Sequence, residues 1–413
     1  MIKEKMPRIL RILNRFNLGG PTYNAAYLTK YLSPEYETLL IGGKHGQDED
    51  SSEFIINGMG LNAEIIPDMQ REISPVNDIS VYNKIKQIIR DFKPDIVHTH
   101  AAKAGMLGRR AAYSMGVPVI VHTFHGHVFH SYFNPVKTAT FIQLERALAK
   151  RTSKIIAISE LQKKELSETY RIAPADKFSV IPLGFDLDRF NINIDEKRKL
   201  FRERYNIPED AITVGIVGRI VAIKNHQFFV SAISELKKIS NKKVIAIIVG
   251  DGELRNSTEE FAQKCGLKTG TRYNQKEKTD IIFTSWIRDI DRVYAGLDIV
   301  TLTSKNEGTP VSLIEALATG KPVVSTNAGG ILDVVEHEIT GLIAHDNECL
   351  TFTNYLKYLI ENPAKAALMG KNGNIEMHKK FGYKRLILDT ACLYNDLLKN
   401  AKYQVKKPSL FFL

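Results

Sequence analysis

The chain has 413 residues, of which 44% are hydrophobic and 25% are charged, values that are typical of a folded chain with a sizeable core. This composition excludes a disordered or fibrous protein. The 57 Lys and Arg residues outnumber the 46 Asp and Glu residues and give a net charge of +11, most of it in the first half. The excess favours an anionic partner (nucleic acid, a phosphorylated small molecule or an acidic membrane face), although plain solubility explains it equally well.

Nothing in the sequence indicates a membrane span or an exported protein. The longest dense apolar stretch, residues 244–249, is far shorter than the roughly 18 residues that cross a bilayer. The first ten residues lack the apolar core of a signal peptide. The three cysteines are scattered, which suits a reducing compartment and predicts neither a disulfide framework nor a metal site. We therefore expect a cytoplasmic location.

Short apolar runs alternate with longer amphipathic ones along most of the chain, a pattern that predicts strand–helix units and parallel sheets. The predicted strands are residues 8–13, 38–42, 95–99, 118–123, 154–159, 178–182, 213–217, 244–249, 281–284, 299–303 and 322–325. The predicted helices are residues 24–32, 82–92, 103–115, 137–149, 227–239, 253–265 and 311–319. From about residue 351 to residue 401 the chain is expected to be entirely helical.

The alternation breaks at residues 186–210, which are highly charged and contain no predicted strand. We interpret residues 1–190 and 211–380 as two doubly wound, Rossmann-like α/β domains, joined by a linker at 191–210. Residues 381–413 are expected to form a C-terminal helix and tail that pack back toward the first domain. Sheets of this kind bind ligands beyond the carboxyl ends of their strands, so we expect a deep cleft between the domains. For the basic, aromatic end at 406–413, a frayed terminus is favoured over a membrane contact.

The most informative segment is residues 304–320, SKNEGTPVSLIEALATG, which follows the predicted strand 299–303. Thr309 is a suitable N-cap and Pro310 suits the first position of a helix. The amides from Gly308 to Ser312 would then point out of a helix N-terminus, where they predict an anion site.

Two carboxylates belong to the same segment. Glu307 precedes the predicted helix and Glu315 lies inside it. Carboxylates beside an anion site are suited to accept hydrogen bonds from sugar hydroxyls. A carboxylate in the first turns of a helix also occurs for dipole reasons alone, and the spacing does not separate these interpretations.

Two cations follow the predicted strand 213–217. The strand ends at Gly218 and Arg219, and Lys224 comes just before the next helix. An Arg and a Lys at the end of a strand can clamp a diphosphate, but they can equally be solvated loop charges. The next strand-to-helix turn, IVGDGEL at 248–254, is not a G-x-G-x-x-G motif, and the chain has no Walker motif.

The motifs V-G-R-x(4)-K, V-G-D-G, E-G-T-P-V-S-L-I-E-A-L-A-T-G-K-P-V-V and G-G-I-L-D-V-V together resemble the retaining nucleotide-sugar glycosyltransferases of family four, which have the GT-B fold. The resemblance implies that Arg219 and Lys224 neutralise the donor diphosphate. It also implies that Glu315 binds the ribose hydroxyls, that Glu307 binds hydroxyls of the donor sugar, and that the loop 284–288 lines the nucleobase. The residues expected to contact the donor are Gly19, Gly20, Gly218, Trp286, Gly308, Thr309, Pro310, Val311, Ser312 and Glu315.

Six of the 11 histidines lie between residues 98 and 130, within the predicted first domain. The sequence HTHAAKAGMLGRRAA and the later VHTFHGH resemble the same family, in which the His before Gly, here His125, lies by the donor sugar and the acceptor. Lys103 would face the acceptor. We expect structural roles for His98 and His122.

Two further expectations concern arginine and metal ions. Arg109 and Arg110 are expected on an outer helical face. His-x-His can be half of a metal site, but no acidic or Cys companions lie nearby in the sequence. Three Asp-x-Asp patterns, at 48–50, 186–188 and 289–291, occur in unrelated contexts and are attributed to chance. Because fixed charges can stabilise a leaving diphosphate, we expect no cofactor and no essential metal.

The resemblance implies a metal-independent, retaining glycosyltransferase in which His125, Arg219, Lys224 and Glu307 are the catalytic residues. We expect a hexosyl- or N-acetylhexosaminyl-transferase that moves a sugar from a nucleotide sugar, with UDP as the favoured nucleotide, to a saccharide or lipid-linked acceptor in surface polysaccharide or glycolipid synthesis. The basic first half is compatible with peripheral contact at the inner face of an anionic cytoplasmic membrane. The alternatives are a nucleotide-sugar epimerase of similar fold and a non-catalytic two-domain ligand-binding protein. A nucleic-acid partner is disfavoured, because Trp286 is the only Trp and no recognition motif occurs.

Overall fold

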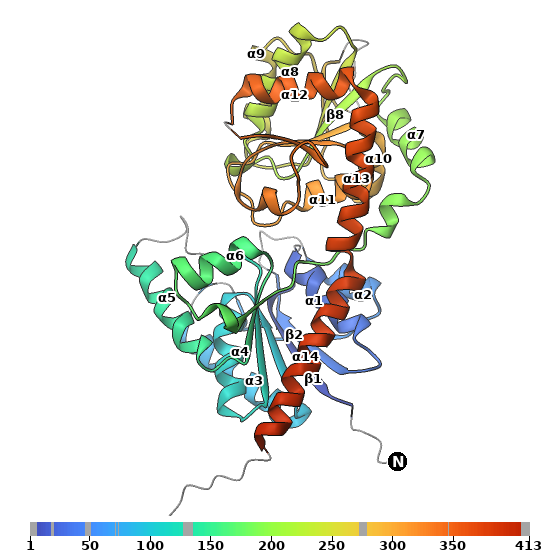
Figure 1. The fold of residues 1–413 in the computed structure, drawn as a ribbon. Helices are drawn as coiled ribbons and strands as arrows, with labels where there is room; N and C mark the ends of the chain where they lie inside the picture. Colours follow the sequence, from blue (N-terminus) through green and yellow to red (C-terminus); the bar gives the residue numbers. More distant parts are fainter. Residues whose placement is uncertain are drawn as a thin grey trace, which may run out of the picture. The chain divides into compact units, whose positions relative to one another are not determined.

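The computed structural model of the chain describes residues 6–17, 20–45, 51–70, 72, 74–126, 135–271, 279–345 and 347–405 (Figure 1). The chain divides into two compact units. The first consists of Met1–Phe185 together with Tyr383–Leu413, and the second consists of Asp186–Gly382.

The first unit is built on a parallel sheet of seven strands in the order β3-β2-β1-β4-β5-β6-β7. Its strands are β1 (Arg8–Arg15), β2 (Glu37–Gly43), β3 (Ala63–Ile65), β4 (Ile96–His100), β5 (Val119–Phe124), β6 (Lys154–Ala157) and β7 (Phe178–Val180). Its helices are α1 (Gly20–Tyr31), α2 (Glu53–Gly58), α3 (Pro75–Phe92), α4 (Ala102–Ser114), α5 (Pro135–Ala149), α6 (Glu160–Lys164) and α14 (Tyr383–Val405), with one-turn helices η1 (Glu165–Thr169) and η2 (Ala175–Lys177).

Helices cover both faces of the first sheet, so its strands are apolar on both sides. On β1, Leu10 and Ile12 pack with α3 and α4, whereas Ile9 packs on the opposite face with α1 and α14. Figure 1 shows α14 alongside α1, and Leu386 and Tyr394 of α14 are buried against this sheet. The C-terminal helix is therefore part of the first unit.

The second unit repeats the architecture with a sheet in the order β10-β11-β9-β8-β12-β13-β14, again parallel throughout. Its strands are β8 (Ile212–Val217), β9 (Val244–Val249), β10 (Thr269–Gly270), β11 (Ile281–Phe283), β12 (Ile299–Leu302), β13 (Val323–Thr326) and β14 (Gly341–Ala344). Its helices are α7 (Ile194–Arg204), α8 (His226–Ile239), α9 (Arg255–Lys264), α10 (Ile290–Gly296), α11 (Val311–Ala318), α12 (Cys349–Glu361) and α13 (Pro363–Phe381), with one-turn helices η3 (Asp188–Asn191), η4 (Ala222–Lys224) and η5 (Gly329–Asp333).

All predicted strands are present, with ends that differ by one or two residues, and the chain is helical after residue 349 as expected. The strands that sequence analysis missed, β3, β10 and β14, are all at sheet edges and have two to four residues each. Such runs are too short to show a period of two. Helix α3 begins seven residues earlier than predicted, with Pro75 in its first turn.

The expected linker contains a helix that is integral to the second unit. Phe201 of α7 packs on α10, where a Cβ on Gly296 would lie 2.1 Å from the Phe201 ring. The charges that suggested a solvated segment form ion pairs instead: Lys197 lies 2.7 Å from Asp291, and Arg198 lies 2.8 Å from Asp298. The high charge of this stretch therefore reflects docking through ion pairs.

Across the described ranges, every helix is either too short or too polar to cross a lipid bilayer.

Candidate functional site

In the second unit, the loops that follow β8 and β9 pack against each other through main chain. The Gly218 amide donates to the Val249 carbonyl at 2.9 Å, and the Ile220 amide donates to the Asp251 carbonyl at 2.9 Å. A Cβ on Gly250 would lie 2.1 Å from the Gly218 carbonyl oxygen, so this contact requires glycine. The packing leaves the Arg219 side chain exposed at the carboxyl end of the sheet, with no ion pair to any described residue.

We expect Gly250→Ala to destabilise the protein by about 1–3 kcal/mol more than Gly266→Ala, because the added methyl group overlaps main chain. Both glycines have a positive φ, 137° for Gly250 and 78° for Gly266, so both substitutions carry backbone strain. Only Gly250 is crowded, because a Cβ on Gly266 would meet no atom within 4 Å. Urea titrations of both variants measure the difference, and equal losses would show that the two loops can separate at no cost.

The second pair of loops joins β8 to β12 through Lys224 and Glu307. The Lys224 ammonium pairs with the Glu307 carboxylate, and the Ser304 hydroxyl donates to the same carboxylate oxygen at 2.5 Å. The Thr303 hydroxyl donates to the Lys224 carbonyl at 3.0 Å, which fixes the loop. The side chain of Glu307 is 10% exposed, so the charge pair is largely removed from water. The Lys224 Cε lies 3.9 Å from the position that a Cβ on Gly218 would occupy.

Helix α11 begins at Val311, as in the predicted range 311–319, but Pro310 is not its first helical residue. The Val311 amide donates to the Thr309 carbonyl at 2.9 Å, and this tight turn leaves Pro310 at the N-cap position. The expected N-cap role of Thr309 is therefore wrong. Pro310 has no N–H and the Val311 amide is already bonded, so only part of the expected set of amides remains available for an anion. Among the described residues, the N–H groups of Gly308, Thr309 and Ser312 have no backbone acceptor.

The loop after β13 packs against the main chain of Glu307 and Gly308. The Gly330 amide donates to the Glu307 carbonyl at 2.8 Å, and a Cβ on Gly330 would lie 1.9 Å from the Gly308 carbonyl oxygen. A Cβ on Gly308 itself would meet nothing within 4 Å, so this residue leaves open space for a ligand. The Gly329-Gly330 pair belongs to the motif G-G-I-L-D-V-V, and no role was predicted for it. The adjacent glycines were the signal that a close backbone contact occurs there.

Glu315 has a different set of partners from Glu307. Its carboxylate lies 3.8 Å from the Arg189 guanidinium, and burial raises the pKa of Glu315 to about 7, against the opposing effects of Arg189 and Tyr294. Burial also raises the pKa of Tyr294 well above its usual value, so its hydroxyl is protonated. Arg189 and Tyr294 were not predicted, and nothing in their spacing relative to Glu315 identifies them.

The loop at residues 284–288 is anchored to the loop after β9. Arg255 donates to the Thr284 carbonyl at 2.5 Å and pairs with Asp251 at 3.3 Å, and the Ser285 hydroxyl donates to Asp251 at 3.1 Å. The Trp286 side chain is 57% exposed. The predicted donor residues Gly218, Trp286, Gly308, Thr309, Pro310, Val311, Ser312 and Glu315 thus lie on loops or helix starts at or near the carboxyl ends of β8, β11 and β12.

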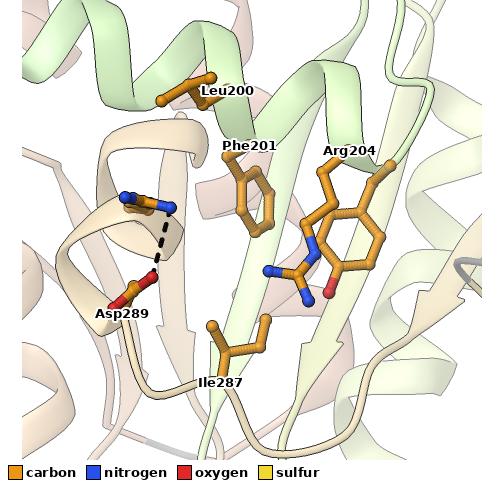
Figure 2. Close-up of a pocket in the computed structure, with 7 residues that line it drawn as sticks. Leu200, Phe201, Arg204, Ile287 and Asp289 are labelled. Carbon is orange, nitrogen blue, oxygen red and sulfur yellow. Dashed lines mark ion pairs between the residues drawn. The ribbon is translucent and has the colours of Figure 1, made fainter.

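A separate shallow hollow, whose volume of about 280 Å³ includes open solvent, lies between α7 and the start of α10 (Figure 2). It is lined by Leu200, Phe201, Arg204, Tyr205, Ile287, Asp289 and Arg292. Asp289 and Arg292 form an ion pair of 3.3 Å in its wall. Ile287 belongs to the loop 284–288 that we expected to line the nucleobase, whereas none of the predicted catalytic residues lines this hollow.

In the first unit, His125 follows β5 and its Nε2 lies 2.8 Å from Nδ1 of His100. Burial lowers the pKa of His125 to about 3, so the ring is neutral at physiological pH. His98 and His122 are fully buried within the sheet and bond to Thr123 at 2.7 Å and Thr99 at 2.8 Å, in line with a structural role.

Lys103 is occupied within the first unit. Its ammonium lies 2.6 Å from the Asp78 carboxylate and also donates to the Glu72 carbonyl, and its side chain is 7% exposed. Binding of an acceptor by Lys103 remains a prediction that would require exchange of these partners. Gly20 is the first residue of α1, whereas Gly19 lies outside the described residues.

Arg109 does not lie on an outer face. It is fully buried and bonds to both oxygens of Glu145 on α5, at 2.7 and 2.9 Å. The helical period alone could not show that a carboxylate from α5 compensates its charge. Arg110 is exposed as expected.

No group of three or more His, Cys, Asp or Glu side chains among the described residues is arranged to hold a metal ion. The Asp48–Asp50 pattern and the tail 406–413 lie outside the residues that the structure describes.

Two family models match the chain. Residues 197–375 match the model described as "Glycosyl transferases group 1", and residues 19–189 match the one described as "Glycosyltransferase Family 4". Between them the two models account for most of both units.

Among characterised proteins, the chain is similar to the UDP-Gal:alpha-D-GlcNAc-diphosphoundecaprenol alpha-1,3-galactosyltransferase of Escherichia coli. The two are 29% identical over 343 residues, which covers 82% of this chain and 85% of that protein. The capsular polysaccharide biosynthesis glycosyltransferase CapM of Staphylococcus aureus is 25% identical over 345 residues, with 82% and 86% covered.

Solved structures show the same fold. Anabaena Alr3699/HepE in complex with UDP superposes with a TM-score of 0.77 at 20% identity, covering 94% of this chain and 100% of that one. A glycosyltransferase from Rickettsia africae gives a TM-score of 0.78 at 22% identity, with 96% and 100% covered.

Proposed function

This chain belongs to the glycosyltransferases, with a GT-B architecture of two Rossmann-like units, and from that premise we propose that it is a retaining enzyme that takes its sugar from a UDP-sugar. The sugar is a hexose or an N-acetylhexosamine, and the acceptor is a saccharide or lipid-linked saccharide of a surface polysaccharide or glycolipid pathway. The relatives support these choices, because the E. coli protein is named for UDP-Gal and a diphosphoundecaprenol acceptor, and HepE was solved with UDP.

One observation carries the proposal: two cations and a set of free amides converge at the carboxyl ends of β8 and β12. Lys224 lies against Gly218 and pairs with Glu307, and the neighbouring Arg219 is exposed and unpaired among the described residues. The unbonded amides of Gly308 and its neighbours precede α11. This combination is suited to a diphosphate, because fixed positive charges and helix N-termini both favour anions.

The reaction breaks the bond between the anomeric carbon of the sugar and the diphosphate oxygen. Negative charge develops on the leaving diphosphate, where Arg219, Lys224 and the free amides would stabilise it. The acceptor hydroxyl forms the new glycosidic bond from the same face of the sugar, and its proton passes to the departing phosphate oxygen. Retention follows from same-face attack, and neither a protein base nor a metal ion is needed in this scheme.

The two glutamates would recognise hydroxyl groups. Glu307 uses one carboxylate oxygen for Lys224 and Ser304, so its second oxygen could accept from a donor-sugar hydroxyl. Glu315 lies apart from this pair, with Arg189 and Tyr294, and would accept from the ribose. The basic first unit would suit an anionic lipid-linked acceptor, with peripheral contact at the inner face of the cytoplasmic membrane.

We expect UDP to stabilise the protein against heat, with a gain of about 2.7 kcal/mol at a concentration 100 times its Kd. ADP and GDP at the same concentration serve as matched ligands, and Arg219→Ala is the control variant that should lose most of the gain. The measurement is the unfolding midpoint with each nucleotide. Equal stabilisation by all three nucleotides would contradict the choice of UDP, and no stabilisation by any of them would contradict the proposed donor site.

The reaction itself is tested with a UDP-sugar labelled in the sugar. Label that passes to a saccharide acceptor with the donor's anomeric configuration, as read by NMR, supports retention. Label that stays on the nucleotide as a different sugar supports an epimerase instead. The same assay with a chelator tests the metal: loss of activity that added metal restores would contradict a metal-independent reaction.

A further inference from the structure

A network of buried polar side chains connects β1, β4 and α14 of the first unit to His125. Arg11 of β1 is fully buried, and its Nη1 lies 2.9 Å from Nδ1 of His98 and 3.4 Å from Nε2 of His100. His100 continues the network through its Nδ1, which lies 2.8 Å from Nε2 of His125. The Tyr394 hydroxyl of α14 lies 2.5 Å from Nδ1 of His98 and 3.4 Å from Nη1 of Arg11. No role has so far been given to Arg11 or His100.

Arg11 fixes the direction of the hydrogen bonds, because a guanidinium can only donate. Nε2 of His100 faces Arg11 and must therefore accept, which leaves the ring proton of His100 on Nδ1. That Nδ1–H donates to Nε2 of His125, so Nε2 of His125 also accepts. The single proton of the His125 ring is then on Nδ1.

This assignment of donors and acceptors requires that each histidine ring is neutral and carries one proton. Burial and the nearby charge keep the rings neutral. Burial and the positive charge of Arg11 lower the pKa of both His98 and His100 well below the usual value, and burial alone lowers that of His125 to about 3. No carboxylate among the described residues contacts Arg11, whose Nε and Nη2 have no partner. Neutral rings are thus the acceptors for a buried cation.

The branch through His98 agrees with this assignment. His98 presents Nδ1 to Arg11 and to the Tyr394 hydroxyl, so Nδ1 accepts and the ring proton is on Nε2. Nε2–H then donates to the Thr123 hydroxyl at 2.7 Å. His98 and His100 therefore carry their protons on opposite nitrogens. The two hydrogens of Arg11 Nη1 face three acceptors, so the two contacts of 3.4 Å, to His100 and to the Tyr394 hydroxyl, share one hydrogen.

We propose that Arg11, acting through His100, holds His125 in the Nδ1–H tautomer, so that His125 meets its substrate as a hydrogen-bond donor and not as a base. Arg11 and His100 are positioning residues. Nδ1 of His125 is buried and has no partner among the described residues, so its N–H lacks an acceptor until a ligand oxygen reaches it. The tautomer follows from the first unit alone, whereas the contact with a sugar or phosphate oxygen rests on the proposed function. With its only lone pair engaged by His100, His125 cannot remove the acceptor proton, which leaves that task to the departing phosphate.

The tautomer is measured directly on the full chain by long-range 15N–1H correlation of 15N-histidine-labelled protein, with His125 assigned from the signal that His125→Asn removes. We expect the Nδ1–H pattern in the ligand-free wild type. In His100→Phe, and in Arg11→Met, we expect His125 to shift to the Nε2–H tautomer, which is favoured by free imidazole side chains. Thr123→Val is the matched control: it removes a partner of His98 only and should leave His125 unchanged. An Nε2–H pattern or a charged ring in the wild type would overturn the proposal, whether or not the variants fold.

Activity provides the second readout. The Asn side chain places an amide N–H near the position of Nδ1, whereas the Gln side chain mimics Nε2. We expect His125→Asn to retain about tenfold more activity than His125→Gln or His125→Ala, because it keeps the donor. Equal losses in all three variants would contradict the donor role. If the wild type transfers no sugar from any nucleotide, the proposed function fails, while the NMR result still decides the tautomer.

Discussion

Lys224→Ala is expected to lower kcat by roughly 10²–10³-fold, or about 2.7–4 kcal/mol of transition-state stabilisation, by analogy with the loss of one preorganised oxyanion donor. The ammonium pairs with Glu307, and the Thr303 hydroxyl fixes the Lys224 main chain by donating to its carbonyl, so the lysine needs no reorganisation when charge develops on the diphosphate. The effect should fall mainly on kcat, because the charge increases as the sugar–phosphate bond breaks. Steady-state kinetics with the UDP-sugar identified by the binding screen measure it.

A lysine–acid pair elsewhere in the second unit provides the control. Lys237 lies 2.7 Å from Asp280 at the surface, and Lys237→Ala should leave activity unchanged and cost at most about 1 kcal/mol of stability. Lys224→Ala also leaves Glu307 with Ser304 as its described side-chain partner, so thermal unfolding of the variant must be recorded alongside the kinetics. A folded Lys224→Ala enzyme with near-normal kcat would refute the assigned role.

A double-mutant cycle tests whether the two side chains act as a pair. Glu307→Gln should lower kcat less in the Lys224→Ala background than in the wild type.

The sequence was most informative where function depends on the order of residues within one loop. Gly218, Arg219 and Lys224 follow a strand whose apolar run is unmistakable, and the ends of adjacent parallel strands meet at one edge of the sheet. Local pattern and topology together therefore located the candidate donor site in the second unit.

The sequence was uninformative where a side chain depends on a partner from another element. Arg109 looked like a solvated cation because its carboxylate partner, Glu145, is 36 residues away on α5. Arg11 interrupts an apolar strand, and only the sheet order shows that histidines of β4 lie beside it. The charged stretch that contains α7 was taken for a linker because its ion-pair partners on and near α10 follow almost a hundred residues later in the chain. Compensation of a charge at long sequence separation cannot be seen in a single sequence.

Glu315→Gln is expected to increase the free energy of unfolding of the ligand-free protein relative to the wild type. The increase should be larger at pH 8 than at pH 4 by up to roughly 3 kcal/mol. Burial raises the pKa of Glu315 from 4.5 to about 7, so ionisation is easier in the unfolded chain than in the folded one. In the wild type, the contribution of Glu315 to the free energy of unfolding is fully present below pH 4.5, and it is lost as the pH rises through 7. Glutamine cannot ionise, so the variant lacks this loss. Urea titrations at pH 4, 6 and 8 measure the difference between the two proteins.

Glu203→Gln is a suitable control, since the Glu203 side chain is 60% exposed and, among the described residues, forms its ion pair with Lys199 at 3.9 Å. It should show no such trend with pH. A pH-independent difference between wild type and Glu315→Gln would contradict the raised pKa.

Glu315 should also make nucleotide binding depend on pH. Its ionisation destabilises the ligand-free protein but should favour binding of the nucleotide. Hydroxyl donors of a ribose stabilise the carboxylate form of Glu315, so binding should lower its pKa and release a proton between pH 6 and 7. UDP affinity of the wild type should therefore rise as the pH increases through 7, whereas the Glu315→Gln variant should bind more weakly and without this dependence. Calorimetry in buffers of different ionisation enthalpy detects the released proton. If the variant binds UDP as tightly as the wild type at pH 8, Glu315 does not contact the nucleotide, and the energetic cost of keeping an ionised carboxylate beside Tyr294 would need another explanation.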